Sequence, residues 1–206
     1  MLKLLLKERA WNYAEQFIRY PDSFLQVGKN GFLSGVWILG NNYKGSGFYG
    51  AYPPQYIERV MALFPNAKKV MHLFSGSLPS GDYIRVDIAS YGNLNDMHRG
   101  PDVVSDAHYL ARCFKKQKFD LIIADPPYTK ADAARYGAPM IHRKKVLEQC
   151  AAVLQPGGFV VWLDTVWPMI HKKHLVLVGA IGILRSQNHR VRFCFLMQKP
   201  MLRKRK

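Results

Sequence analysis

The 206-residue chain has few acidic residues, only three cysteines and no long apolar run. Its longest apolar candidate, residues 175–184, is about half the length of the roughly 20-residue stretch that crosses a membrane. The first eleven residues do not form the continuous apolar segment of a signal peptide, because charged side chains interrupt them at Lys3, Lys7, Glu8 and Arg9. We therefore expect a cytoplasmic protein that makes no membrane contact.

The cysteines are also too dispersed to form a recognisable framework. Cys113, Cys150 and Cys194 lie far apart and make no C-x-x-C pair. This spacing favours reduced thiols over disulfides or a zinc site. His171 and His174 have no potential ligands nearby in the sequence, so we expect no bound metal.

Basic residues, in contrast, are abundant. Thirty Lys and Arg against 14 Asp and Glu give a formal net charge of +16, which attracts polyanions over long range. The composition predicts a nucleic-acid partner, although each basic run alone could equally be a solvated surface or a disordered end. The runs cover residues 115–118, 143–145, 172–173 and 203–206.

The length is suited to one domain, and the sequence has no internal repeats or low-complexity segments. We expect a single domain over residues 1–206. It comprises an N-terminal extension over 1–48, a catalytic core over 49–199 and a basic tail over 200–206. Within the extension we expect a helix near residues 3–20 and a loop rich in Gly and Asn over 28–50.

Within the core, strand-like and helix-like segments alternate, which is typical of βαβ units and a parallel sheet. The last two strand-like runs are separated only by residues 187–189, which predicts an antiparallel hairpin that closes the sheet. The fold class is therefore α/β, with a mostly parallel sheet. Strands are expected over 68–74, 83–88, 119–125 and 157–164, helices over 53–64, 106–114 and 143–154, and the hairpin over 174–186 and 190–199.

The stretch "DLIIADPPYTK", residues 120–130, carries the strongest functional signal. Its apolar part suits a strand that is buried on both faces, and open α/β sheets hold ligands at the carboxyl ends of such strands. Asp and Pro are also ordinary turn residues. The tetrad Asp125-Pro126-Pro127-Tyr128 is nevertheless uncommon enough to indicate a site.

This tetrad resembles the D/N-P-P-Y/F/W motif of the S-adenosylmethionine-dependent amino methyltransferases that act on nucleic-acid bases. The resemblance extends from about Tyr49 to Lys199 and implies a Rossmann-like class I methyltransferase fold, with the motif at the end of the fourth strand. It implies that the Asp125 side chain and the Pro126 carbonyl accept the hydrogens of an exocyclic amino group. Pro127 would stiffen the peptide, and Tyr128 would stack on a flipped base.

The same resemblance implies a site for S-adenosylmethionine. "VMHLFSGS", residues 70–77, is similar to the family's F-x-G-x-G loop, which places Phe74, Ser75 and Gly76 at the cofactor. Two departures stand out in this region. Leu78 replaces the second glycine, and His72 stands where an acid is usual.

Four further residues are implied in cofactor binding. Asp87 ends the next expected strand, where an acid can hold both ribose hydroxyls. Asp106 corresponds to the residue that holds the adenine amino group. Tyr52 and Pro53 match a segment that encloses the methionine end of the cofactor.

The sequence therefore predicts an adenine-specific DNA methyltransferase that modifies N6. Two alternatives stay open: a methyltransferase for guanine N2 or adenine N6 in RNA, and a nucleic-acid-binding protein with a decayed cofactor site. No recognition domain fits between the cofactor segment and the tetrad. We expect loops, notably residues 129–145 and the basic tail, or a second subunit, to contact the target.

Overall fold

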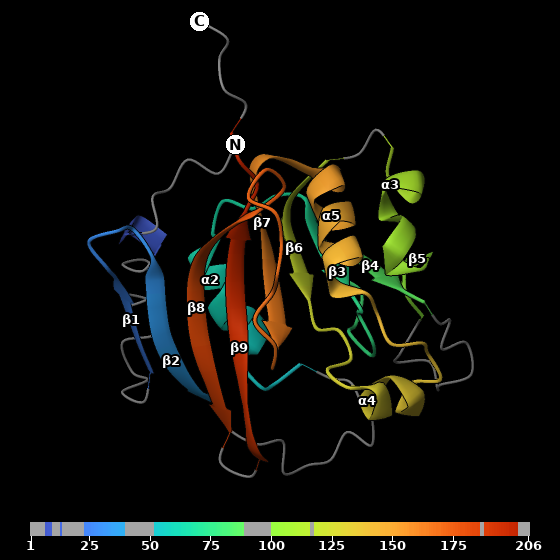
Figure 1. Cartoon of the computed structure of the whole chain (residues 1–206), viewed down its shortest axis with the longest axis horizontal. Helices are drawn as coiled ribbons and strands as arrows, with labels where there is room; N and C mark the ends of the chain where they lie inside the picture. The colour runs from blue at the N-terminus through green and yellow to red at the C-terminus, as the bar shows by residue number, and fades with distance from the viewer. Residues whose placement is uncertain are drawn as a thin grey trace, which may run out of the picture.

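The computed structural model describes residues 7–9, 13, 23–39, 52–88, 100–115, 118–185 and 188–201. Within these ranges the chain forms a nine-stranded sheet with the order β1-β2-β8-β9-β7-β6-β3-β4-β5 (Figure 1). The strands are β1 (Ser23–Val27), β2 (Leu33–Leu39), β3 (Val70–Leu73), β4 (Ile84–Asp87), β5 (Val103–Val104), β6 (Phe119–Ala124), β7 (Leu154–Asp164), β8 (Val176–Arg185) and β9 (Asn188–Gln198).

The strands from β3 to β7 form a parallel block, as the sequence predicts, and the block includes β5, which was not predicted from the sequence. β3 pairs with β4 and β6, β4 pairs with β5, and β6 pairs with β7, all in parallel. The direction of strand addition reverses between β3 and β6, because β4 and β5 lie on one side of β3 while β6 and β7 lie on the other. Such a reversal is the topological switch point, where open α/β sheets bind ligands.

β8 and β9 form the predicted antiparallel hairpin, and β9 lies between β7 and β8. Numbered from β3, the core strands therefore stand in the order 3-2-1-4-5-7-6. The sheet continues beyond this hairpin, since β2 pairs in parallel with the outer side of β8.

The loop predicted over residues 28–50 was wrong over Leu33–Leu39, which forms β2. Leu33, Trp37 and Leu39 are buried there, and this burial explains why the segment joins the sheet. β1 pairs with β2 in antiparallel fashion through a short turn. Lys7–Arg9 and Tyr13 are helical, in agreement with the predicted N-terminal helix, and the rest of that prediction lies outside the described residues.

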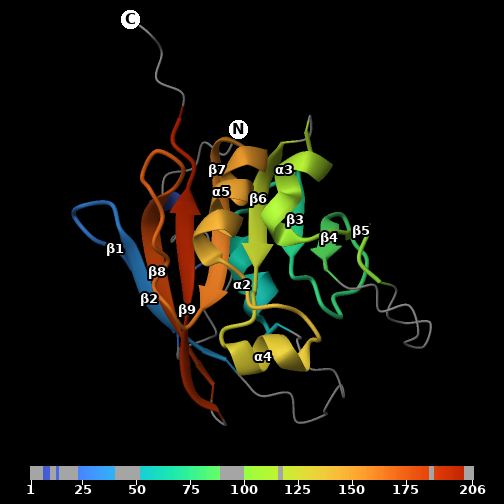
Figure 2. The same ribbon diagram turned by 45° about the vertical axis from the view of Figure 1, so that its right-hand side comes forward.

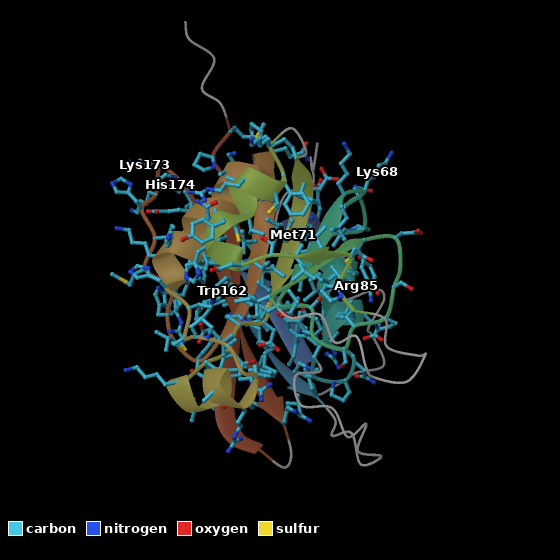
Figure 3. All side chains as sticks on the ribbon, turned by 90° about the vertical axis from the view of Figure 1, so that its right-hand side faces the viewer. Lys68, Met71, Arg85, Trp162, Lys173 and His174 are labelled. Atoms are coloured by element: carbon cyan, nitrogen blue, oxygen red, sulfur yellow. The ribbon has the colours of Figure 1, made fainter. Side chains whose placement is uncertain are left out.

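Helices cover both faces of the sheet. In Figures 1 and 2, α2 (Tyr56–Leu63) lies behind the sheet, while α3 (Leu110–Cys113) and α5 (Arg143–Val153) lie in front of it. Alternate residues of β6 pack on opposite faces of the sheet. Leu121 and Ile123 belong to the cluster that includes α2, whereas Ile122 and Ala124 belong to the cluster that includes α5. Met71 and Trp162, on β3 and β7, lie in the middle of the molecule (Figure 3).

Three short helices refine the expectations. The helix predicted over 106–114 is a 3-10 turn, η1 (Ala107–Tyr109), followed by α3. The loop expected after the tetrad contains α4 (Lys130–Arg135), which begins at a capping box: the Thr129 side chain accepts from the Asp132 amide, and the Asp132 side chain accepts from the Thr129 amide. α4 lies beyond the carboxyl end of β6 (Figure 2).

No helix in the described part of the chain is long and apolar enough to cross a membrane.

Candidate active site

The sheet places the two predicted motifs next to each other. Leu73 at the end of β3 pairs with Ala124 at the end of β6. Phe74 and Asp125 follow these residues directly, so the glycine loop and the Asp-Pro-Pro-Tyr tetrad leave the sheet side by side at the switch point. The tetrad also ends the fourth core strand, as the family resemblance implied.

Asp125 has an environment that disfavours its charged form. Burial raises the pKa of its carboxyl to about 6, against the opposing effects of a hydrogen bond from Tyr128 and the charge of Arg192. The Tyr128 hydroxyl donates to Asp125 Oδ1 over 2.5 Å. A carboxyl that titrates near neutral pH can accept hydrogens when ionised and can take up a proton during a reaction.

Tyr128 is held at three points. Its hydroxyl contacts Asp125, its ring carries the Arg192 guanidinium carbon 5.0 Å from the centroid, and its carbonyl accepts a 2.8 Å hydrogen bond from Arg143 Nη2. Burial and the nearby Asp125 charge raise the pKa of the phenol well above its ordinary value. Tyr128 is therefore a neutral hydrogen-bond donor with a fixed backbone.

Arg143 connects the tetrad to the fully buried Asp164 at the end of β7. Its Nε lies 2.7 Å from Asp164 Oδ2, and its Nη2 lies 3.2 Å from Oδ1. Asp164 also accepts from Trp162 Nε1 over 3.0 Å and from the Thr165 amide over 2.7 Å. Sequence reasoning missed this pair, having grouped Arg143 with a basic run. The sequence feature that could have indicated it is Asp164, an acidic residue at the end of an apolar strand.

The glycine loop is shaped by Asp87, at the end of β4. The Gly76 amide donates to Asp87 Oδ2 over 2.9 Å, and the Ile88 amide donates to Oδ1 over 2.7 Å. Gly76 has φ 52°, a left-handed conformation that glycine adopts without steric cost. Phe74 has φ 60°, which is strained for a side chain of its size, and such strain concentrates at functional sites. The predicted Phe74, Ser75, Gly76 and Asp87 thus form one structural unit.

A cleft of about 200 Å³ opens between this loop and the start of α2. It is smaller than the roughly 300–1,000 Å³ typical of pockets for drug-sized ligands, so it suits one end of an extended molecule. Three predicted residues line it, together with several that sequence reasoning missed, including Gln55 with φ 62° and Glu58. The lining residues are Tyr52, Pro53, Gln55, Ile57, Glu58, Ser75, Ser77, Leu78 and Pro79.

His72, on β3, contacts the cleft residue Tyr52 and stands in the position where the resembling family has an acid. Burial lowers its pKa to about 4, so the imidazole is neutral near pH 7. Its ring packs edge-on against Tyr83 at 4.6 Å and Tyr52 at 5.8 Å between centroids. The Tyr52 hydroxyl lies 3.5 Å from His72 Nδ1 and donates to the Ile123 carbonyl over 3.4 Å. His72 therefore supports Tyr52.

Asp106 precedes η1, and the parallel pairing of β4 with β5 brings it to the same edge of the sheet as Asp87. Its Oδ1 accepts from the His108 amide over 2.8 Å and contacts His108 Nδ1 at 2.6 Å. The His142 amide donates to His108 Nε2 over 2.9 Å, which places the ring proton on Nδ1. Partial burial raises the Asp106 pKa, but hydrogen bonds from His108 outweigh it and the net direction is downward, so Asp106 stays ionised.

Within the described ranges, no group of three or more His, Cys, Asp and Glu side chains is placed to hold a metal ion.

Comparison with known proteins supports the fold at low sequence identity. No protein-family model and no curated sequence matches the chain. Among solved structures, TrmN from Thermus thermophilus is 16% identical with a TM-score of 0.51, over 72% of this chain and 49% of TrmN. A protein from Streptococcus mutans assigned as a SAM-dependent methyltransferase is 17% identical with a TM-score of 0.46, over 86% and 56%. YhhF from Escherichia coli, assigned as a methyltransferase, is 13% identical with a TM-score of 0.45, over 81% and 92%.

The chain thus spans about half the length of the first two of these proteins. The strand order, the switch point and the likeness to TrmN agree with one another. The chain has the Rossmann-like fold of S-adenosylmethionine-dependent methyltransferases that its sequence predicted.

Proposed function

We propose that the protein transfers a methyl group from S-adenosylmethionine to an exocyclic amino nitrogen of a nucleic-acid base, with adenine N6 in DNA as the expected target. The observation that carries this proposal is the pairing of Leu73 with Ala124, which sets Asp125 beside the Phe74–Gly76 loop. An acceptor for an amino group and a loop suited to the cofactor thereby share one edge of the sheet.

The residues at that edge fit the cofactor. A carboxylate has about four acceptor positions, so Asp87 can hold the ribose hydroxyls while it keeps its hydrogen bonds to the Gly76 and Ile88 amides. Asp106 would take the adenine amino group, and the cleft beside Tyr52 and Pro53 would take the methionine end. The bound cofactor would supply an electrophilic methyl group.

The tetrad supplies the groups that such a reaction needs from the protein. The lone pair of an exocyclic amine is delocalised into the base, so the amine is a poor nucleophile until acceptors hold its hydrogens and turn the lone pair outward. Ionised Asp125 and the Pro126 carbonyl are these acceptors. Methylation acidifies the nitrogen, and Asp125, whose pKa is about 6, can then accept the released proton.

The +16 net charge supports a nucleic-acid substrate. The same amino-group chemistry applies to bases in DNA and RNA, so both polymers belong in the test. The full chain would be incubated with cofactor labelled in the methyl group and with duplex DNA, single-stranded DNA or RNA, and transfer would be counted. We expect incorporation into DNA, with N6-methyladenine as the product after nuclease digestion.

Two variants, one directly after β6 and one near its start, sharpen this test. Asp125→Ala should abolish transfer and leave the thermal shift by S-adenosylhomocysteine intact, because Asp125 contacts the amine and not the cofactor. Asp120→Asn is the matched control, since it removes a carboxylate from the opposite end of the same strand. Near-wild-type transfer by Asp125→Ala would contradict the proposal. If no cofactor bound to the wild-type chain, the decayed-site alternative would stand instead.

A further inference from the structure

One arginine of the β8–β9 hairpin, Arg192, contacts Tyr128, and a second, Arg185, interacts electrostatically with both. The Arg192 guanidinium carbon stands 5.0 Å from the centre of the Tyr128 ring. Arg192 on β9 pairs with Ile183 on β8, and Arg185 follows Ile183 by two residues. Both arginines therefore lie on the same part of the hairpin. Charge interactions link Arg185 with both Arg192 and Tyr128. The hairpin thus brings two cations to the tetrad from a distant part of the sequence.

Among the described residues these cations form no ion pair of the kind that other arginines near the site have, although the charge of Arg192 lowers the pKa of nearby Asp125. Arg143 is paired with Asp164 at 2.7 Å, and Arg85 with Asp102 at 2.8 Å. In the part of the chain that the structure describes, neither Arg185 nor Arg192 forms an ion pair.

The Nε atoms of Arg185 and Arg192 are also buried without a hydrogen-bond acceptor among the described residues. Burial, and then the charge of Arg192, lower the pKa of Arg185. Two neighbouring cations repel each other, and an arriving anion would relieve that repulsion.

We infer that Arg185 and Arg192 bind a phosphate of the nucleotide whose base is held at Asp125 and Tyr128. The inference rests on the proposed function and extends it from the base to the backbone of the substrate. Guanidinium groups match phosphate oxygens with paired N–H donors, which a flexible ammonium group does not. Because Arg192 covers one face of the Tyr128 ring, the base would stack on the other face, with its phosphate toward the hairpin.

The test compares a nucleoside with its nucleotides. Binding of deoxyadenosine and of its 5′- and 3′-monophosphates to the full chain would be measured by calorimetry, with S-adenosylhomocysteine at saturation so that the probes cannot enter the cofactor site. At least one of the two monophosphates should bind about tenfold or more tightly than deoxyadenosine. This ratio corresponds to roughly 1.4 kcal/mol of binding free energy.

Variants then show which residues provide the affinity that the phosphate group adds. Arg192→Gln and Arg185→Gln should each remove most of it, whereas Arg192→Lys should keep part of it, because the charge remains but the planar fork is lost. Lys173→Gln is the matched control: it removes one positive charge at the end of the molecule opposite α4 (Figure 3). Thermal melting of each variant, with and without S-adenosylhomocysteine, reports whether the fold and the cofactor site survive.

The outcomes separate this inference from the proposed function. If the cofactor product binds but the phosphate gain is absent, or is lost equally in Lys173→Gln, the phosphate site is wrong and the methyltransferase proposal stands. Tighter binding of N-acetylglutamate than of any nucleotide would also overturn the phosphate site, in favour of a protein carboxylate. If the cofactor product does not bind, titration without it still tests the arginines, and a gain that depends on Arg192 would support the phosphate site alone.

Discussion

Asp125 should make the folded protein less stable at neutral pH than a variant without the charge. Its pKa rises from the ordinary 3.8 to about 6, chiefly through burial. At about 1.4 kcal/mol for each tenfold change in proton affinity, this corresponds to about 3 kcal/mol. The folded state binds the proton more tightly than the unfolded state, so stability falls as the pH rises from about 4 to about 6. Asp125→Asn removes this loss and keeps an oxygen that can accept from Tyr128.

The measurement is urea unfolding of the wild type and Asp125→Asn at pH 4 and pH 7.5, at equal ionic strength. The two proteins should have similar unfolding free energies at pH 4, and the variant should be more stable by up to about 3 kcal/mol at pH 7.5. Asp106→Asn is a control of opposite sign, because the Asp106 pKa is lowered and its carboxylate stabilises the fold at neutral pH. A difference between the wild type and Asp125→Asn that does not change with pH would refute the reasoning.

Three further results are expected. Under the proposed function the rate of methyl transfer should rise as the pH passes through about 6, because only ionised Asp125 can accept an amine hydrogen beside the Pro126 carbonyl; a flat profile over pH 5–8 would argue against this role. Arg143→Met should lower the unfolding free energy by about 3–5 kcal/mol, since it leaves buried Asp164 without its cation, and a loss below about 1 kcal/mol would show that the pair is not coupled to the fold. Tyr128→Ala should weaken single-stranded DNA binding by roughly 1–3 kcal/mol through lost stacking, with no change in its salt dependence by fluorescence anisotropy. A shallower salt slope would assign Tyr128 to phosphate contact instead.

Sequence patterns predicted strands best where the strand is buried on both faces of the sheet. β3 and β6 are almost entirely buried, so they appear as continuous apolar runs, and the residues that follow them stand out against these runs. β2 was missed because its residues are unevenly buried and Gly and Asn surround it. α4 is only six residues long, and its available signal was the spacing between Thr129 and Asp132.

Contacts between distant segments could not be predicted in the same way. Arg143 and Asp164 are 21 residues apart, and Arg192 is farther still from Tyr128. Their proximity depends on the parallel pairing of β6 with β7 and on the place of β9 beside β7. No local pattern specifies that order of strands, so the arginines appeared in the sequence only as part of a general positive charge.

The two departures from the cofactor motif have physical explanations that leave the loop ordered. Leu78 does not have a positive φ, so its side chain imposes no backbone strain at the position where the motif has glycine. Its carbonyl accepts a 3.0 Å hydrogen bond from Arg85, which Asp102 holds in turn at 2.8 Å. His72 is neutral and packs beneath Tyr52, so it adds no charge that would repel a sulfonium group. A decayed site would be expected to lose such supporting contacts. At the position where the motif has a second glycine, the loop is instead anchored to β4 through Arg85, and this hydrogen bond fixes the loop geometry.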